Sequence, residues 1–183
     1  MFIKQLTAQL NAIRLRARQL LVGLSPAQLT RRPDPTRWSI AECVVHLNMS
    51  AADYLPLIAA AIDKAKRENL TGNGPFNPGW MGRFLINSME PPPKRRFKAP
   101  EKIAHPVPVG DDAKLLADFL KTQDELERLA KEAEGLNLEK IKIQSPYAWW
   151  LRLRLCAVFP FVFAHERRHL WQAEQVKRQL ALM

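Results

Sequence analysis

The sequence predicts an all-α protein, a four-helix bundle that forms one domain over residues 1–183. Apolar residues recur at intervals of three and four along four long stretches, and this periodicity is typical of amphipathic helices. One short stretch alternates at every second residue, so a single extended crossing is expected. With 183 residues, of which 47% are hydrophobic and 25% charged, the chain can bury one sizeable core and is not expected to be disordered.

The first half of the chain predicts two long helices joined by a short one. The first covers residues 2–22 and ends at Gly23, a residue common just after a helix. A short helix over residues 25–30 follows. The second long helix covers residues 39–68, and its start carries a capping-box pattern in which Ser39 precedes Glu42 by three positions. Pro56 lies inside this helix and predicts a kink.

The second half begins with a long excursion rich in proline and glycine over residues 69–110, between the second and third long helices. One short helix is predicted inside it, at residues 80–87. The third long helix covers residues 112–134, and the extended crossing covers residues 138–143. Ser145 and Pro146 resemble a helix start, so the last helical stretch is predicted over residues 145–180, with a bend or interruption near Pro160.

The chain is strongly basic, with a net charge of +10 and an isoelectric point near 10.0. Such a charge is compatible with nucleic acid, a membrane surface or an anionic small molecule. The basic residues are spread along the chain, and the one compact cluster comprises Lys94, Arg95, Arg96 and Lys98. No RNP motif, zinc knuckle or basic zipper accompanies them. The basic residues are therefore expected to serve solubility or the binding of an anionic small molecule, and not of nucleic acid.

The sequence gives no sign of a membrane segment or a secretory signal. No window without a charged residue is longer than 14 residues, whereas a membrane-spanning helix needs about twenty. The N-terminal segment carries Lys4 and Arg14 within an amphipathic pattern, which is not typical of a signal peptide. Cys43 and Cys156 lie within predicted helices and are expected to be reduced. A cytoplasmic protein is expected.

The last helix carries two histidines, His165 and His169, at positions i and i+4. Side chains with this spacing share one face of a helix, so both imidazoles can reach one metal ion. The five residues also satisfy the H-E-x-x-H pattern of zinc proteases. The metzincin continuation, however, requires glycine and histidine where this chain has Gln172 and Gln175, and only 14 residues follow His169. A metalloprotease is excluded on these grounds.

Both histidines lie in an apolar stripe, which comprises Val158, Val162, His165, His169, Gln172 and Val176. Buried imidazoles need partners, which can be a metal ion or a carbonyl or carboxylate acceptor. A third metal ligand would have to come from another helix, where His46 shares a face with Cys43 and Asp53. Taken alone, His46 is compatible with an ordinary hydrogen-bonded histidine. His105, beside Pro106 in the excursion, is not favoured as a ligand.

Two segments resemble the paired histidine motifs of the DinB/YfiT-like superfamily. Residues 38–47, WSIAECVVHL, resemble the first motif, and residues 164–173, AHERRHLWQA, resemble the second. The order of elements is similar to that family over nearly the whole chain. The resemblance implies a four-helix bundle in which His46, His165 and His169 hold one divalent ion, and it implies a homodimer. Characterised relatives include thiol S-transferases and isomerases that use bacillithiol or mycothiol.

A divalent ion on three neutral imidazoles would keep positions open for water, substrate or a thiolate. Zinc and nickel both suit such ligands, and a metal-dependent hydrolase and a thiol S-transferase using a low-molecular-weight thiol both remain open. Candidate catalytic residues are Asp53, Glu166 and Gln172, although a salt bridge to an arginine is the favoured role of Glu166. Trp149 and Trp150 are predicted in the core or at an interface. The alternatives are a bundle that binds metal or ligand without catalysis, and a basic protein associated with nucleic acid.

Overall fold

The computed structural model describes residues 2–94, 98–108 and 110–181. Within these residues the chain forms six α-helices, one 3-10 turn and two short strands. Their bounds are α1 Phe2–Leu21, α2 Pro26–Thr30, α3 Ile40–Arg67, α4 Gly79–Met89, η1 Glu101–Ile103, α5 Asp112–Glu132, β1 Lys142–Gln144, β2 Arg152–Arg154 and α6 Leu155–Ala181. The predicted all-α class is confirmed.

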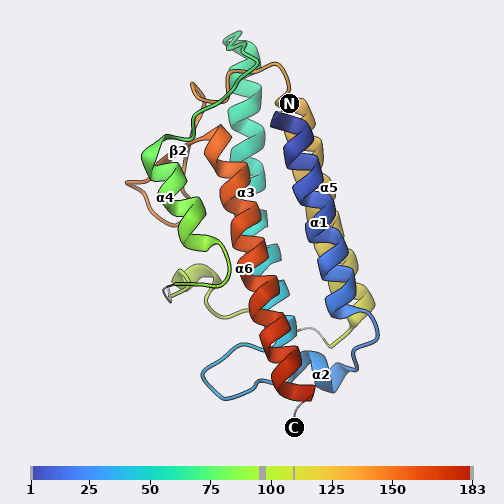
Figure 1. The fold of residues 1–183 in the computed structure, drawn as a ribbon. Helices are drawn as coiled ribbons and strands as arrows, with labels where there is room; N and C mark the ends of the chain where they lie inside the picture. The colour runs from blue at the N-terminus through green and yellow to red at the C-terminus, as the bar shows by residue number, and fades with distance from the viewer. Residues whose placement is uncertain (1, 95–97, 109, 182–183) are drawn as a thin grey trace.

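The four long helices form a bundle in which each helix has two neighbours. Helix α1 contacts α5 and α6, and α3 contacts the same two helices from the other side. Figure 1 shows α1 beside α5 and α6 beside α3, with α4 lying against the outer side of α6. The pairing of α3 with α6 matters most for function, because the predicted metal ligands lie on these two helices.

The start of α3 is held by the predicted capping box. The backbone N–H of Glu42 donates to Ser39 Oγ at 3.2 Å, and the backbone N–H of Ser39 donates to Glu42 Oε2 at 2.8 Å. Arg32 from the preceding loop also pairs with the buried Glu42 carboxylate. These contacts fix the first turn of α3, and His46 follows in the next turn. Neither Pro56 in α3 nor Pro160 in α6 interrupts its helix.

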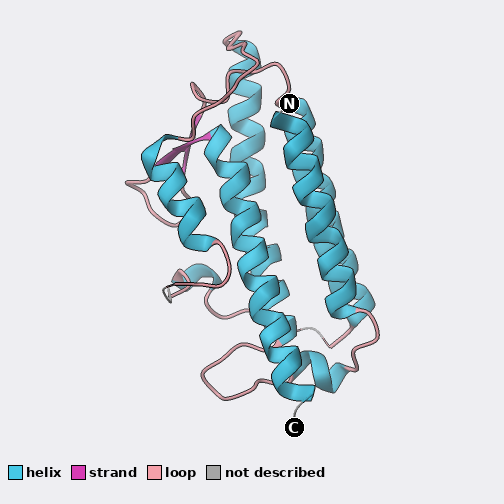
Figure 2. Ribbon diagram, in the orientation of Figure 1, coloured by secondary structure: helices cyan, strands magenta, loops and turns pink. Residues whose placement is uncertain are grey.

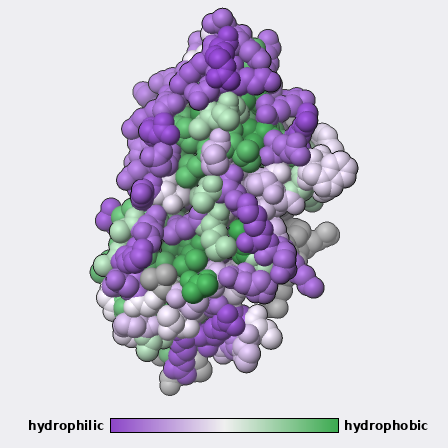
Figure 3. Space-filling view, turned by 180° about the vertical axis from the view of Figure 1, so that it is seen from behind, coloured by the Kyte–Doolittle hydropathy of each residue, from purple (hydrophilic) through white to green (hydrophobic). Residues whose placement is uncertain are grey.

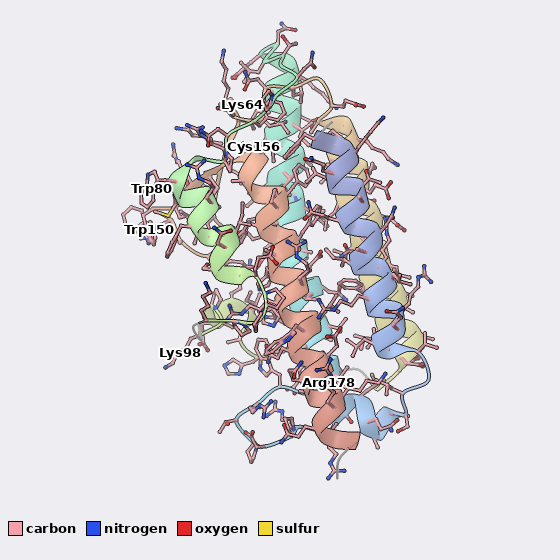
Figure 4. All side chains as sticks on the ribbon, in the orientation of Figure 1. Lys64, Trp80, Lys98, Trp150, Cys156 and Arg178 are labelled. Carbon is pink, nitrogen blue, oxygen red and sulfur yellow. The ribbon has the colours of Figure 1, made fainter. Side chains whose placement is uncertain are left out.

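The prediction that the last helix begins at residue 145 is wrong. Residues 145–151 form turns, and β2 then pairs antiparallel with β1, with Ile143 opposite Leu153. Both of these side chains face the core and are buried, so this pairing replaces the helix that the Ser-Pro pattern predicted. Trp149 and Trp150 lie in the turn and are 82% and 66% exposed, so they are not core residues. In Figure 4, Trp150 projects outward at the same edge of the molecule as Trp80 of α4.

Between α3 and α5 the described residues form α4, η1 and connecting loops (Figure 2). The short helix predicted at residues 80–87 is therefore confirmed as α4. Its close contact with α6 depends on Gly82, because a Cβ atom there would lie 2.7 Å from the Cβ atom of Ala157. This contact places the C-terminal end of α4, and the loop that follows it, alongside the middle of α6.

One helix among the described residues, α3, is long and apolar enough to meet the length and composition test for a membrane span. Its buried side chains, which include Leu47, Ile58 and Ile62, pack between α5 and α6. A helix in the core of a bundle passes the same test, because it is also long and has apolar side chains to bury. The length and composition of α3 are therefore only weak evidence for a membrane segment. Figure 3 shows that hydrophilic residues cover much of the back face, with hydrophobic residues between them.

Replacing Phe119 with alanine is expected to lower the free energy of unfolding by about 3–5 kcal/mol. Phe119 lies on α5 with no exposed surface, so its removal leaves a cavity in the centre of the bundle. Phe84 on α4 is 58% exposed, and Phe84→Ala is the matched control, with an expected change within about 1 kcal/mol. Urea unfolding followed by circular dichroism measures both. Equal losses in the two variants would contradict the core assignment.

Candidate metal centre

Three histidines from two helices converge on one point. His46 lies on α3, and His165 and His169 lie one turn apart on α6. One ring nitrogen from each can be chosen so that all three lie within 4.8 Å of one another. The ring centroids of His46 and His169 are 4.5 Å apart, and those of His165 and His169 are 4.6 Å apart. The structure thus brings together the three residues that the family resemblance implies as ligands.

A backbone carbonyl sets the tautomer of His46. Its Nδ1 lies 2.9 Å from the carbonyl oxygen of Ile103 in η1. A carbonyl can only accept a hydrogen bond, so Nδ1 carries the proton and Nε2 presents a lone pair. That Nε2 atom lies 3.2 Å from Nε2 of His165. Two nitrogens that bind one tetrahedral zinc at its usual bond lengths are about 3.3 Å apart, so the spacing suits a shared ion.

The third histidine provides a further observation in favour of a metal. Nδ1 of His169 is buried and has no hydrogen-bond partner among the described residues. A buried polar atom without a partner costs free energy, and a metal ion bound at this Nδ1 atom would offset that cost. The donor set, three nitrogen ligands on two rigid helices, therefore fits a divalent ion of the zinc or nickel type.

All three imidazoles are held in their neutral form, which is the form that binds metal. Burial is the main cause, and it lowers the pKa of His165 to about 3, with smaller contributions from His46 and Arg168. Burial also lowers the pKa of His169 well below its ordinary value, and the neighbouring His165 adds to this effect. The pKa of His46 is lowered by burial too, although its hydrogen bond to Ile103 opposes the shift. Each ring thus has a free lone pair at neutral pH.

A cavity of about 560 Å³ opens beside the histidines, within the size range of small-molecule sites. Tryptophan, methionine and proline side chains form its apolar walls, and three basic and two amide side chains provide the polar groups. No carboxylate is found among the described residues that line it. Besides the three histidines, the lining residues are Thr36, Arg37, Trp38, Met89, Pro93, Lys98, Ala99, Pro100, Arg168, Trp171, Gln172 and Gln175.

The basic side chains reach this cavity from three different segments. Arg168 is 8% exposed, and its Nη1 donates to the carbonyl oxygen of Ser88 at 3.0 Å. Arg37 donates to Oε1 of Gln179 at 3.0 Å. Lys98 is exposed and, in Figure 4, extends outward from the loop beside α6. Of the basic cluster noted in the sequence, Lys94 is exposed, whereas Arg95 and Arg96 lie outside the described residues.

The three candidate catalytic residues lie in three different places. Gln172 lines the cavity. Asp53 does not line it, and its carboxylate accepts from Lys102 Nζ at 2.5 Å and from the Tyr147 hydroxyl at 3.1 Å. Glu166 faces α5, where it accepts from Nε2 of Gln123 at 2.6 Å. The favoured salt bridge of Glu166 to an arginine is therefore wrong, since its hydrogen-bond partner is an amide.

The remaining candidates lie outside the histidine group. His105 is exposed, and its Nε2 atom lies 3.3 Å from Oε1 of Glu101. Cys43 and Cys156 are both free and buried. Burial raises the pKa of the Cys43 thiol far above its usual range, and that of Cys156 to about 11. Neither thiol is ionised at neutral pH, so neither offers a reactive thiolate.

Sequence reasoning missed several groups around the site. The carbonyl of Ile103 carries no side-chain signal and lies in an irregular segment. Arg168 lies inside the second histidine motif, between its two histidines, and this position could have indicated that Arg168 lies near the site. Trp38 is the first residue of the first histidine motif, and its ring centroid lies 4.7 Å from that of His46 and 5.7 Å from that of His169. Its place directly before the capping box explains how it reaches the site.

The second and last long helices together present three neutral histidines beside a cavity. The protein is thus of the class of helical bundles that carry a candidate metal centre. The sequence model of the DinB superfamily matches residues 9–173, and the chain belongs to that superfamily. The solved structure of YfiT from Bacillus subtilis is similar, with a TM-score of 0.62 and 12% identity, covering 98% of this chain and 87% of that chain. YfiT is described as "a probable metal-dependent hydrolase with an unusual four-helix bundle topology". At this identity the likeness shows the fold alone. No curated protein matches the chain significantly.

Proposed function

We propose that this protein is a metal-dependent enzyme in which His46, His165 and His169 hold one zinc or nickel ion. The observation that carries the proposal is the convergence of three neutral imidazoles at the wall of a cavity of small-molecule size. A divalent ion on such ligands lowers the pKa of water or of a thiol and so supplies a nucleophile near neutral pH. The description of YfiT as metal-dependent supports the same class.

The chain's own residues orient the site and its substrate. The proton on His46 Nδ1 is held by the Ile103 carbonyl, so the other nitrogen faces the centre of the group. The Trp38 ring packs against His46 and His169 and forms part of the cavity wall. Gln172 lines the cavity and can donate or accept a hydrogen bond there. None of the described lining residues carries a carboxylate, and the acidic group nearest to Arg37 is Asp34, whose Oδ2 lies 3.8 Å from Arg37 Nε outside the lining.

We propose a small anionic molecule as the substrate. Arg37, Lys98 and Arg168 approach the cavity, while its described lining contains no acidic side chain, so the local charge favours an anion. A carboxylate or phosphate could pair with these groups while an apolar part packs against Trp38 and Trp171. Hydrolysis and transfer of a low-molecular-weight thiol both use the same geometry. We also propose that the protein is a homodimer, as the family resemblance implies, and that it is cytoplasmic, as the sequence suggests.

Metal-free protein is expected to be inactive toward small anionic esters, and toward electrophiles offered with a low-molecular-weight thiol. One equivalent of zinc or nickel should restore activity in one of these two assays, and that assay identifies the reaction. Activity that survives chelation would contradict the proposal, as would inactivity in both assays with stoichiometric metal bound. Lys98→Gln should raise KM for the anionic substrate a few-fold. Lys140→Gln, which removes another exposed charge far along the chain, is the control and should leave KM unchanged.

The alternative of a basic protein that binds nucleic acid makes a different prediction. Its affinity for duplex DNA would be tight at physiological salt and would fall steeply as salt rises. We expect only weak binding, because the basic residues are dispersed and no recognition motif accompanies them. A titration of labelled duplex at two salt concentrations separates the two cases.

A further inference from the structure

An irregular segment, rather than a helix, supplies the acceptor for His46. The carbonyl oxygen of Ile103 belongs to η1, a single turn in the loops between α4 and α5. The turn is closed internally, since the backbone N–H of Ile103 donates to the carbonyl of Pro100 at 2.9 Å. The Ile103 side chain is 2% exposed and packs into the protein. The position of this carbonyl therefore depends on what holds η1 against α3.

An ion pair joins η1 to the helix that carries His46. Lys102, the neighbour of Ile103, places its Nζ 2.5 Å from Oδ1 of Asp53 on α3. Asp53 follows His46 by seven positions, so the two residues share one face of α3 two turns apart. Only 18% of the Asp53 side chain is exposed, compared with 65% for Lys102. The carboxylate is thus a fixed point on α3, and Lys102 reaches it from the loop.

The carboxylate is itself held from a second side. The Tyr147 hydroxyl donates to Oδ2 of Asp53 at 3.1 Å, and the Tyr147 ring packs edge-on against Tyr54 at 5.9 Å between centroids. Tyr147 lies in the turn between β1 and β2. The two Asp53 oxygens therefore bind different donors from two loops. Both oxygens of this carboxylate already accept hydrogen bonds, and Asp53 is not among the described residues that line the cavity. Asp53 is therefore not placed to act as a general base on a substrate there.

We propose that Asp53 is a positioning residue that, through Lys102, holds the Ile103 carbonyl where it fixes the tautomer of His46. The inference rests on the proposed function, because His46 is taken as a metal ligand. Groups that hydrogen-bond a metal-binding histidine commonly change metal affinity by about 10- to 100-fold when they are removed. Here the effect is relayed: loss of the ion pair releases η1, the carbonyl moves, and His46 Nδ1 loses its acceptor.

The experiment compares four purified full-length variants by zinc affinity, measured in competition with a chromophoric chelator. Asp53→Asn and Lys102→Gln should each weaken zinc binding about 10- to 100-fold at unchanged stoichiometry. Lys102→Arg, which can still reach the carboxylate, should restore affinity to near that of wild type. Asp63→Asn is the matched control, because Asp63 is an exposed aspartate on the same helix, and it should bind zinc normally.

Lys102→Gln separates positioning from a simple field effect. Removing a positive charge near a cation would strengthen zinc binding if only the electrostatic field mattered, whereas loss of positioning weakens it. Unchanged or stronger zinc binding by Lys102→Gln overturns the inference. An equal loss in Asp63→Asn also overturns it, since that result would indicate a general effect of charge. Circular dichroism and the melting temperature check that each variant is folded.

A second readout needs no metal. The ring-nitrogen NMR signals of metal-free wild type should show His46 protonated at Nδ1, and Asp53→Asn and Lys102→Gln should lose that preference. A wild-type protein that binds no zinc would defeat the proposed function, but these signals would still decide the positioning inference. If both variants keep His46 protonated at Nδ1 as in wild type, the inference fails even if the metal site is real.

Discussion

Replacing either His165 or His169 with alanine is expected to abolish stoichiometric binding of zinc. Each variant leaves two imidazoles at most, and the remaining pair cannot complete the site between α3 and α6. His46→Ala should weaken binding severely, because it removes the only described ligand on α3. The measurements are the metal content after loading and dialysis, and isothermal titration calorimetry with zinc.

His105→Ala is the matched control for these variants. His105 is exposed and pairs with Glu101 outside the histidine group, so its loss should leave zinc binding unchanged. If His165→Ala still bound one equivalent with wild-type affinity, the metal centre would not be where the three imidazoles converge. A comparable loss in His105→Ala would indicate adventitious binding to surface histidines.

Glu166→Gln is expected to stabilise the metal-free protein at alkaline pH and to leave it unchanged near pH 4. Burial raises the pKa of Glu166 to about 7 in the folded protein, from an ordinary value of 4.5. Below pH 4.5 the carboxyl is protonated in both folded and unfolded states and contributes no difference. As pH rises from 4.5 through 7, the carboxyl releases its proton more readily in the unfolded state than in the folded state. The free energy of unfolding therefore falls by about 3 kcal/mol over this range.

The hydrogen bonding of this carboxyl agrees with a neutral form. Oε2 of Glu166 and Oε1 of Gln123 are both buried and have no hydrogen-bond partner in the described part of the chain, while Nε2 of Gln123 donates to the other Glu166 oxygen. A protonated carboxyl donates from one oxygen and accepts at the other, and so would satisfy both atoms. The amide introduced by Glu166→Gln can do the same without a titrating proton.

Urea unfolding at pH 5 and pH 8, with a chelator present, tests this expectation. The difference between wild type and Glu166→Gln should grow toward pH 8, by up to about 3 kcal/mol. Glu134→Gln changes an exposed carboxylate and should show no such growth. Equal differences at the two pH values would show that Glu166 ionises normally in the folded protein.

The parts of the fold that local patterns specify were predictable. The capping box at Ser39 and Glu42 correctly places the start of α3, since both of its hydrogen bonds form within one turn. The i and i+4 spacing of His165 and His169 correctly places two imidazoles on one face of α6, because helix geometry alone sets that relation. Apolar periodicity likewise locates the four long helices.

The parts that depend on distant partners were not predictable. Ser145 and Pro146 suit either a helix start or a turn, and the pairing of β1 with β2 decides for the turn. That pairing also explains why Trp149 and Trp150 are exposed. The sequence pattern favoured a salt bridge for Glu166 and could not show that its partner is Gln123 on α5. A backbone acceptor such as the Ile103 carbonyl leaves no mark on the sequence.

A crystal structure of the zinc-loaded protein, with anomalous diffraction recorded at the zinc edge, tests the metal centre most directly. We expect one strong peak per chain, within about 2.0–2.1 Å of one ring nitrogen from each of His46, His165 and His169. At least one coordination position should be open to the cavity and filled by a non-protein ligand. A peak elsewhere, or zinc bound by the two α6 histidines with His46 turned away, would contradict the account.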